Sequence, residues 1–255
     1  MADSKLKIDI RRNKILERLR AEGVVRVSEL SKELGVTSVT VRTDLDSLER
    51  DGYLERMQGG AVVKARGVEQ AEPAAEKEKE KLLIAREAAR HIKDGSTLFI
   101  NSGTTTRYLA AALKAHKSLN IVTNSVAVAM ELGDVPAIHV ILLGGEINTQ
   151  YAYTFGENAS EQLCRYQADW AILSVDGVST QAGVTTFHAD EAAINRIMME
   201  RAKDTLIVAD YSKIGRVGFT QLHTIDSSLQ LITDDKCDRS KAAELEALGL
   251  RIICV

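Results

Sequence analysis

The chain has 255 residues, 45% of them hydrophobic and 27% charged, which is an ordinary balance for a globular protein with a small module and one larger domain. No stretch approaches the roughly 18 consecutive apolar residues of a membrane span. The charged N-terminal segment also lacks the apolar core of a secretion signal, so we expect a cytoplasmic protein without a membrane partner.

The net charge of −3 is unevenly divided. Residues 1–67 hold 14 Lys and Arg against 11 Asp and Glu, and the other 188 residues hold 19 against 25. A slightly basic head on an acidic body fits a small nucleic-acid-contacting module.

The cysteines and histidines give no sign of a disulfide framework or of a metal site. The three cysteines are odd in number and widely spaced, which indicates free thiols in a reducing compartment. The five histidines are scattered, and none lies at ligand spacing from a cysteine. We therefore interpret all five as surface or core residues, and we expect no metal and no cofactor. The residues concerned are Cys164, Cys237, Cys254, His91, His116, His139, His188 and His223.

Residues 1–64 predict three helices and a hairpin. Residues 9–22 carry apolar side chains at helical spacing, and Gly23 ends that segment. Val25 and Val27 alternate as a short extended piece, after which residues 29–34 form a short helix. A third helix follows over 39–50, and a strand, a turn with paired glycines and a second strand complete the hairpin over 53–63.

The third helix has the properties of a DNA-reading helix. It buries Val41, Leu45 and Leu48 on one face, and Thr37 or Ser38 can cap its start. The opposite face near its start presents hydroxyls and a cation, which can bond base edges or phosphates. The hairpin would place Arg56 and Lys64 beside the duplex as a wing. The predicted DNA-binding residues are Thr37, Ser38, Thr40, Arg42, Thr43, Arg56 and Gln58.

This head resembles the DeoR-type helix-turn-helix of bacterial sugar-catabolism repressors. That pattern normally has Ser at Thr37, Arg or Lys at Thr43, and often His at Gln58. Thr37 keeps the capping hydroxyl, whereas Thr43 lacks a cation and so removes one expected phosphate contact. The resemblance rests on residues 36–48, which read VTSVTVRTDLDSL, and on Gly52, Arg56 and Gly59-Gly60-Ala61.

The rest of the chain predicts an α/β domain. Residues 65–80 lack apolar periodicity and are interpreted as a linker, which gives a DNA-binding domain over 1–64, with its helix-turn-helix at about 27–50, and a second domain over 81–255. Short apolar strands alternate with helices, which indicates a mainly parallel sheet covered on both faces. We expect strands at 97–100, 120–123, 138–143, 170–175, 205–209, 229–233 and 251–255, and helices at 77–92, 104–114, 126–132, 159–163, 189–201 and 241–248.

Polar and glycine-containing turns follow several of these strands, and ligands bind open α/β sheets at that edge. The turn at 101–105 leads into a helix whose free N–H groups and positive dipole end suit a phosphate, although it is neither a P-loop nor a GxGxxG turn. Lys213 could neutralise such an anion. The predicted effector-binding residues are Asn101, Ser102, Gly103, Thr104, Thr105, Asn124, Gly144, Asp176, Gly177, Glu191 and Lys213.

These turns resemble the C-terminal sensor domain of the same family, which is similar in fold to ribose-5-phosphate isomerase and coenzyme A transferases. The family's usual Asp-Ser-Gly-Thr-Thr reads Asn101-Ser102-Gly103-Thr104-Thr105 here, and its Asp-x-Ser-Lys is kept as Asp210-Tyr211-Ser212-Lys213. The stretch over 176–186, with Glu191-Ala192 and Asn195-Arg196, looks closest to repressors of amino-sugar pathways of the N-acetylgalactosamine type.

The sequence therefore predicts a DNA-binding repressor of a carbohydrate-catabolism operon. Its partners would be double-stranded operator DNA and a phosphorylated sugar that releases it, and we expect a homodimer or homotetramer because one recognition helix covers few base pairs. One alternative is a sugar-phosphate isomerase with Glu191 as general base near Asp176 and Lys213. Another is an oligomerisation adaptor, which would leave the polar turns without a purpose.

Overall fold

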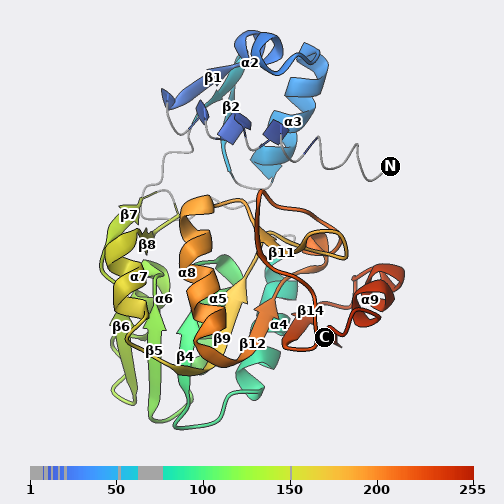
Figure 1. Ribbon diagram of the computed structural model, residues 1–255. Coiled ribbons are helices and arrows are strands. Elements are labelled where there is room, and N and C mark those ends of the chain that lie inside the picture. The colour runs from blue at the N-terminus through green and yellow to red at the C-terminus, as the bar shows by residue number, and fades with distance from the viewer. Residues whose placement is uncertain are drawn as a thin grey trace. The chain divides into compact units, whose positions relative to one another are not determined.

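The computed structural model describes residues 8, 11–12, 14–16, 18–19, 22–50, 53–62, 77–149 and 151–255. The chain divides into two compact units, Met1–Glu76 and Lys77–Val255 (Figure 1). Residues 63–76, which include Lys64 and most of the predicted linker, lie outside the described residues. Residues 77–80 of that linker belong to the second unit, because its first helix begins at Glu78.

The first unit contains helices packed on a small antiparallel sheet. The described residues between 8 and 22 are helical. The strands pair in the order β1-β3-β2, and the buried residues Ile15, Leu45 and Leu48 lie in the core of the unit. After the described part of the first helix, the elements are β1 Val24–Arg26, α2 Val27–Leu34, α3 Ser38–Arg50, β2 Glu55–Met57 and β3 Gly60–Val62.

The extended piece ends earlier than the alternation of Val25 and Val27 predicts. Strand β1 stops at Arg26, and Val27 begins α2 instead of continuing the strand. The Val27 N–H donates to the Gly59 carbonyl at 2.9 Å, and its side chain is buried, so packing decides its conformation. Gly60 lets β1 and β3 approach closely, because a Cβ there would lie 2.0 Å from the Val25 carbonyl oxygen.

The second unit is built on a seven-stranded sheet in the order β15-β14-β12-β9-β4-β5-β6, in which every neighbouring pair is parallel. This confirms the predicted α/β fold class. In chain order the elements are α4 Glu78–Arg90, β4 Thr97–Ile100, α5 Thr104–Leu113, β5 Leu119–Thr123, α6 Val126–Leu132, β6 Ile138–Leu142, β7 Glu146–Asn148, β8 Tyr153–Phe155, α7 Glu157–Leu163, β9 Ala168–Ser174, β10 Gly177–Ser179, β11 Gly183–Thr186, α8 Ala189–Glu200, β12 Ala202–Val208, the 3₁₀ turn η1 Tyr211–Lys213, β13 Thr220–His223, β14 Leu229–Thr233, α9 Arg239–Glu246 and β15 Arg251–Cys254.

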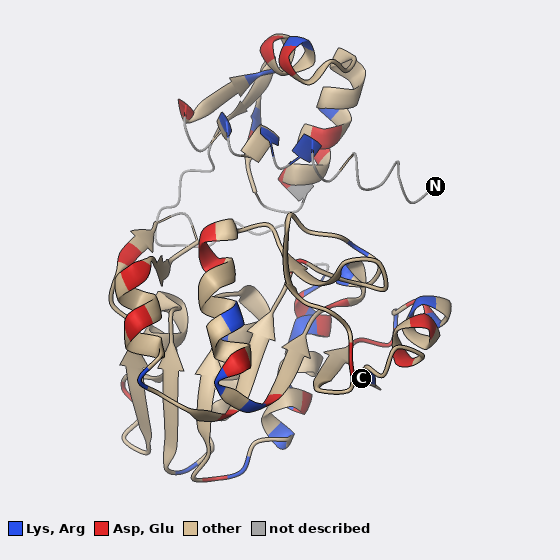
Figure 2. Cartoon of the chain, viewed as in Figure 1, with Lys and Arg blue, Asp and Glu red and all other residues tan. Residues whose placement is uncertain are grey.

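Helices cover both faces of this sheet. One buried cluster joins Ile84 of α4, Leu109 of α5 and Val128 of α6 to one face, and another joins Leu163 of α7 and Ile194 of α8 to the other. The strands contain few charged residues (Figure 2), as expected for strands buried on both sides. The helices among the described residues are too short or too polar to span a bilayer.

Two small antiparallel arrangements lie outside this layered pattern, and the sequence did not predict them. Strands β7 and β8 form a hairpin, and β10, β11 and β13 form a three-stranded sheet. Their strands have three or four residues, which is too short for alternation to be recognised in the sequence. Both arrangements follow carboxyl ends of the large sheet, so they build part of the predicted effector site.

Candidate functional sites

Helix α3 begins with a hydroxyl cap. The Thr40 N–H donates to Thr37 Oγ1 at 3.2 Å, and the Thr37 and Thr40 hydroxyls lie 2.9 Å apart. Thr37 is therefore the capping residue among the two that the sequence offered. Such a cap contributes about 0.5–2 kcal/mol and fixes where the helix starts. It also occupies two of the hydroxyls predicted to contact DNA.

The outward face of α3 holds Ser38, Val39, Arg42 and Thr43. Arg42 is exposed and makes no ion pair or hydrogen bond with any described residue. The Thr43 hydroxyl donates to the Val39 carbonyl at 3.0 Å, so its proton is engaged within the helix. The sequence did not predict the exposure of Val39, whose side chain is 68% exposed.

A buried carboxylate ties the first helix to α3. Asp44 is 2% exposed and accepts hydrogen bonds from Arg11 Nη2 at 3.1 Å and from Arg12 Nε at 3.2 Å. Its negative charge is therefore balanced inside the head and does not oppose DNA phosphates on the outward face. No feature of the sequence pattern assigned this role to Asp44.

The wing residue Arg56 is held against α3. Its Nε lies 3.5 Å from Asp46 Oδ1, and its backbone N–H donates to Glu49 Oε1 at 2.7 Å. Its cation is thus already partly neutralised, which distinguishes it from Arg42. Gln58 is exposed in the turn between β2 and β3, as expected for a wing tip.

Six of the predicted effector residues follow the carboxyl ends of four neighbouring strands of the large sheet. Asn101, Ser102 and Gly103 follow β4, Asn124 follows β5, Asp176 follows β9, and Lys213 lies in η1 after β12. Gly144 also follows such an end, at β6, but its backbone pairs with Gln162 of α7, which accepts from the Gly144 N–H at 3.0 Å. Gly177 lies inside β10.

Asn101 joins two strands and a helix from a fully buried position. Its Oδ1 accepts from the Ser174 N–H at 2.8 Å, and its Nδ2 donates to the Ser174 carbonyl at 2.9 Å and to Asn195 Oδ1 at 3.2 Å. These bonds need both an acceptor and a donor at residue 101, which an amide supplies and a carboxylate does not. The side chain is therefore a positioning group in this structure, and direct contact with an effector stays a prediction.

The start of α5 lies next to the end of β9. A Cβ at Gly103 would lie 2.5 Å from Ser174 Cβ, so only glycine allows this close approach. No side chain caps the helix there, and Thr106 Oγ1 donates to the Gly103 carbonyl at 3.0 Å. Thr104 and Thr105 form the first turn, whose N–H groups have no partner within the helix. The geometry that the sequence suggested for an anion is thus present.

Glu191, in the first turn of α8, lies buried among polar groups. Asn124 Nδ2 donates to its Oε1 at 3.5 Å, and the Ser102 N–H also donates to its carboxyl group. Burial and the nearby carboxylate of Asp176 raise the pKa of Glu191 to about 8. At neutral pH it is mostly a neutral acid with a proton to donate. Asn124 Oδ1 is buried and accepts no hydrogen bond from the described residues.

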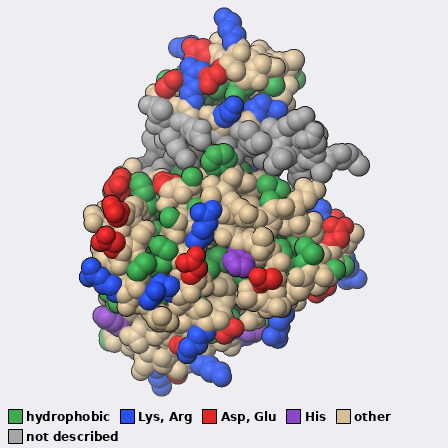
Figure 3. All heavy atoms as spheres, in the orientation of Figure 1, with side chains coloured by type: hydrophobic (Ala, Val, Ile, Leu, Met, Phe, Trp, Pro, Cys, Tyr) green, Lys and Arg blue, Asp and Glu red, His purple; other side chains and the backbone are tan. Residues whose placement is uncertain are grey.

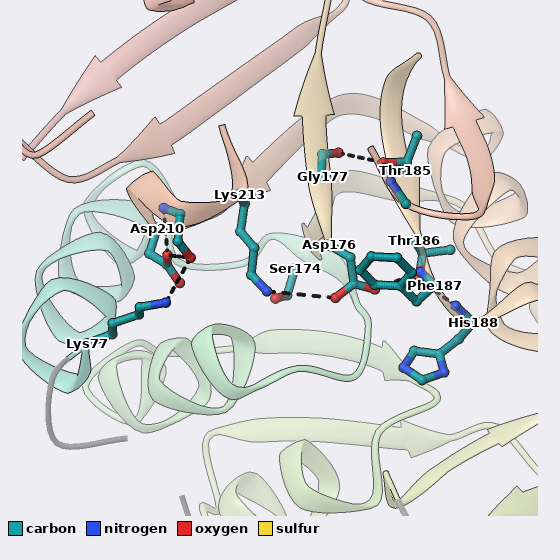
Figure 4. Close-up of polar contacts among 12 residues, drawn as sticks. Lys77, Ser174, Asp176, Gly177, Thr185, Thr186, Phe187, His188, Asp210 and Lys213 are labelled. Carbon is teal, nitrogen blue, oxygen red and sulfur yellow. Dashed lines mark hydrogen bonds and ion pairs between the residues drawn. The ribbon is translucent and has the colours of Figure 1, made fainter. Parts of the chain in front are cut away.

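Asp176 has the opposite electrostatic character. Burial alone would raise its pKa, but Lys213, His188 and the Phe187 N–H lower it to about 2. Lys213 Nζ lies 3.9 Å from Asp176 Oδ1, the Phe187 N–H donates at 2.8 Å, and the Thr186 hydroxyl donates at 3.1 Å (Figure 4). The buried Glu191 and the largely buried Asp176, whose side chain is 17% exposed, thus place a neutral acid next to an ionised one.

His188 and Asn195 are not among the predicted effector residues, but both lie beside residues that are. His188 is 6% exposed and packs on the Tyr151 ring, with ring centroids 4.3 Å apart. This burial agrees with its interpretation as a surface or core histidine. Asn195 lies one turn after Glu191 on α8, and this i, i+4 spacing was the available signal. Among the described residues, no group of three His, Cys, Asp or Glu could hold a metal ion.

Turn η1 connects Lys213 to the start of α4. Lys77 Nζ donates to Ser212 Oγ at 3.0 Å, across 135 residues of sequence. Burial alone would raise the pKa of Asp210, but Lys213, the hydroxyl and N–H of Ser212, and Lys77 together lower it. Tyr211 lies between two lysines, with Lys77 Nζ 5.8 Å and Lys236 Nζ 5.7 Å from its ring centroid. The residue that follows the undescribed linker therefore contacts the turn that carries Lys213.

Two family models match the chain. The DeoR-like helix-turn-helix domain matches residues 11–66, and the DeoR C-terminal sensor domain matches residues 76–235. Together they cover the head and most of the second unit. The match to the sensor domain includes β4, β5, β9 and η1, whose ends hold the polar groups described above.

Several curated relatives are similar over nearly their full length. A putative aga operon transcriptional repressor of Escherichia coli O157:H7 is 31% identical over 250 residues, which is 96% of this chain and 93% of that protein. The glycerol-3-phosphate regulon repressor of Escherichia coli K12 is 32% identical and covers 88% of this chain and 90% of its own. The lactose phosphotransferase system repressor of Lactococcus lactis is 33% identical, with 89% and 91% covered.

Solved structures with similar folds are more distant. A probable sor operon regulator from Shigella flexneri is 13% identical with a TM-score of 0.41, covering 66% of this chain and 88% of that one. Ribose 5-phosphate isomerase A from Methanocaldococcus jannaschii is 18% identical with a TM-score of 0.40, covering 54% of each chain. Both TM-scores are below 0.5, whereas the family models and the curated relatives cover most of the chain. The chain belongs to the DeoR family of DNA-binding transcriptional repressors.

Proposed function

We propose that the chain represses an operon for carbohydrate catabolism and that a phosphorylated sugar bound to its second unit releases it from the operator. The observation that carries the proposal is the group of polar side chains at the carboxyl edge of the large sheet. This group combines the start of α5, which no side chain caps, with Lys213 and the neutral acid Glu191. The names of the relatives, which concern the aga operon, glycerol 3-phosphate and a lactose phosphotransferase system, support a sugar-related target.

The DNA half of the proposal rests on α3. Its outward face carries an exposed arginine that has no partner among the described residues, and its start is fixed by the Thr37 cap. N-terminal residues of a recognition helix are the ones that reach base edges in the major groove. Basic and acidic side chains are mixed on the face of the head that Figure 3 shows, and residues 1–67 have 14 basic against 11 acidic side chains, so net charge supplies little of the affinity. Specific contacts from a pair of heads must supply it, which is why we propose a homodimer or homotetramer.

The effector half rests on complementary chemistry. The N–H groups at the start of α5 suit a phosphate, whose charge Lys213 can balance. The neighbouring Ser102 hydroxyl donates to the Tyr151 carbonyl at 3.3 Å, so an anion would have to compete for its proton. The neutral Glu191 can donate one hydrogen bond to a sugar hydroxyl, and the buried Asn124 Oδ1 can accept another. A phosphorylated sugar offers both kinds of group in one molecule. Amino-sugar phosphates are the first to test, given the resemblance of the stretch over 176–186.

A route from the effector to the linker supports release. An anion that attracts Lys213 competes with Asp176 and Asp210 for its charge. Lys213 belongs to η1, and Asp210 caps the start of this turn. Ser212 of the same turn accepts a hydrogen bond from Lys77, the residue before α4. A change in η1 is therefore passed to the residue that follows the linker. The effector can shift the equilibrium only by its differential affinity for the two states.

Footprinting upstream of the neighbouring genes tests the proposal. We expect the purified full chain to protect a repeated or pseudo-palindromic site, and one of a panel of sugar phosphates to remove that protection at micromolar to millimolar concentration. A thermal-shift screen with the same panel separates sensing from a purely oligomeric role, because only a ligand that binds the native state raises the melting temperature. Absence of any protected site, or a site that no sugar phosphate releases or stabilises, would contradict the proposal.

A further inference from the structure

One apolar side chain stands out on the DNA-reading face. Val39 is 68% exposed, whereas the other exposed large hydrophobic residues among the described part of the head, Val24 and Met57, are each 38% exposed. It is the second residue of α3, one turn before Arg42 and Thr43 on the same face. The core of the head buries Val41, Leu45 and Leu48 on the opposite side, so the exposure of Val39 follows from its place on the helix.

The hydroxyl groups around Val39 are largely engaged. Thr37 caps the helix and contacts the Thr40 hydroxyl, and Thr43 donates to the Val39 carbonyl. Ser38, Val39 and Arg42 are the residues of this face whose side chains make no hydrogen bond or ion pair to any described residue, and of these Val39 and Arg42 are exposed whereas Ser38 is half-buried. Arginine supplies the polar contact. The apolar surface of valine needs an apolar partner to become favourable on binding.

The major groove offers such a partner at one base only. The 5-methyl group of thymine is its single apolar feature, and small apolar side chains contact it in direct readout. Valine suits this contact because its branched Cβ strongly favours one rotamer in a helix, which fixes both methyl groups before binding. A residue in the first turn is also at the end of the helix that approaches the base edges.

We propose that Val39 is a specificity-determining residue that contacts the 5-methyl group of a thymine in each half-site, beside the group bound by Arg42. The assignment rests on the proposed operator binding by α3 and names the base feature that this helix reads. It replaces part of the hydroxyl readout suggested by the sequence with an apolar contact. The cytosine, adenine and guanine edges lack this methyl group, so a thymine is the required base.

Replacing thymine by deoxyuridine tests the contact, because this change removes only the methyl group. The full chain first selects its preferred duplex from a random library, and each thymine of that duplex is then replaced singly. We expect one position per half-site at which deoxyuridine weakens binding by about fourfold, the effect of one buried methyl group. In Val39→Ala, binding to the unmodified duplex falls by about sixteenfold, because both heads lose the contact. The same deoxyuridine replacement then has no further effect.

Val24→Ala is the matched control, since it shortens a partly exposed valine of β1 and should keep the deoxyuridine effect. Circular dichroism melts check that Val39→Ala folds, which we expect because alanine favours helix more than valine. If deoxyuridine weakens binding equally in the wild-type chain and in Val39→Ala, the thymine contact of Val39 is wrong, while operator binding by α3 still stands. If the wild-type chain selects no duplex at all, operator binding itself fails and the contact fails with it.

Discussion

The outward face of α3 and the carboxyl edge of the large sheet arrange their functional groups in opposite ways. On α3, Arg42 and Val39 are exposed and have no partners among the described residues. At the sheet edge, Asn101, Glu191 and Asp176 are tied to other side chains or to the backbone. DNA supplies phosphates and base edges as partners, so the side chains of a DNA-reading face need no partner within the protein. A small effector must fit a site whose polar groups are already held in place. Substitutions in the two regions should therefore differ in what they change.

The largest expected effect is on operator affinity. We expect Arg42→Ala to weaken binding by about 100-fold in a two-headed complex, because each arginine contact with a base contributes about 1–3 kcal/mol. Effector binding and the melting temperature should stay unchanged, since Arg42 has no partner among the described residues. Fluorescence anisotropy with the operator duplex measures the loss.

Arg56→Ala sharpens this result, and Arg165→Ala controls for loss of charge. Arg56 is paired with Asp46, so its removal should cost less affinity than removal of Arg42. Arg165 is an exposed arginine of the second unit and should have no effect. Equal losses of operator affinity in Arg42→Ala and Arg56→Ala would mean that α3 and the wing contribute alike. That result would contradict the expectation that an arginine without an ion pair contributes more than a paired one.

The same contrast explains what the sequence could predict. The buried stripe of α3 and the alternation of strands and helices in the second unit are local patterns, and the structure confirms them. The bonds of Asn101 span 73 and 94 residues, and that of Lys77 spans 135. No local pattern encodes such pairs. The position of the polar turns was therefore predictable from the ends of strands, whereas the partners of each side chain were not.

In the second unit, the next largest expected effect is on stability. Asn101→Asp removes the donor to the Ser174 carbonyl and to Asn195 Oδ1 while keeping the shape of the side chain. We expect a loss of about 1–3 kcal/mol in the free energy of unfolding, the cost of leaving buried polar groups unpaired. Chemical denaturation measures it. Asn120→Asp, at an exposed position of β5, is the matched control. Unchanged stability in Asn101→Asp would show that the amide bonds are not required.

Lys213→Met tests the anion site. We expect the affinity for the releasing sugar phosphate to fall by about tenfold, since a charge-assisted contact contributes roughly 1.5–3 kcal/mol and part of it is screened by solvent. Operator binding without effector should be unchanged. Lys203→Met is the matched control, because Lys203 lies near the other end of β12 and pairs with Asp169. Isothermal titration calorimetry checks both variants, and equal affinities would remove Lys213 from the site.

The neutral state of Glu191 predicts a dependence of stability on pH. Its pKa is raised from 4.5 to about 8 on folding, so the native state binds a proton that the unfolded chain has released. The stability linked to this proton is fully present below pH 4.5 and is lost as the pH rises through 8. Relative to Glu191→Gln, the wild-type chain should lose about 1 kcal/mol between pH 7 and 9. Asp176, with a pKa of about 2, does not titrate in this window. Parallel stability curves for the two proteins would contradict the neutral acid.

The smallest expected effect concerns the connection between the two regions. Lys77→Met removes the hydrogen bond to Ser212 and leaves the residues of the proposed sugar-phosphate site and of α3 unchanged. If η1 passes the state of Lys213 to the start of α4, the affinities for operator and effector should each stay within about twofold. The effector should then reduce operator affinity about threefold less than in the wild-type chain, because the lost hydrogen bond carries part of the coupling free energy. Lys79→Met is the control, since Lys79 is the second residue of α4 and is exposed.

Operator titrations at zero and saturating effector measure the coupling. Unchanged coupling in Lys77→Met would show that occupancy of the effector site reaches the head by another route, even if both sites are correctly assigned.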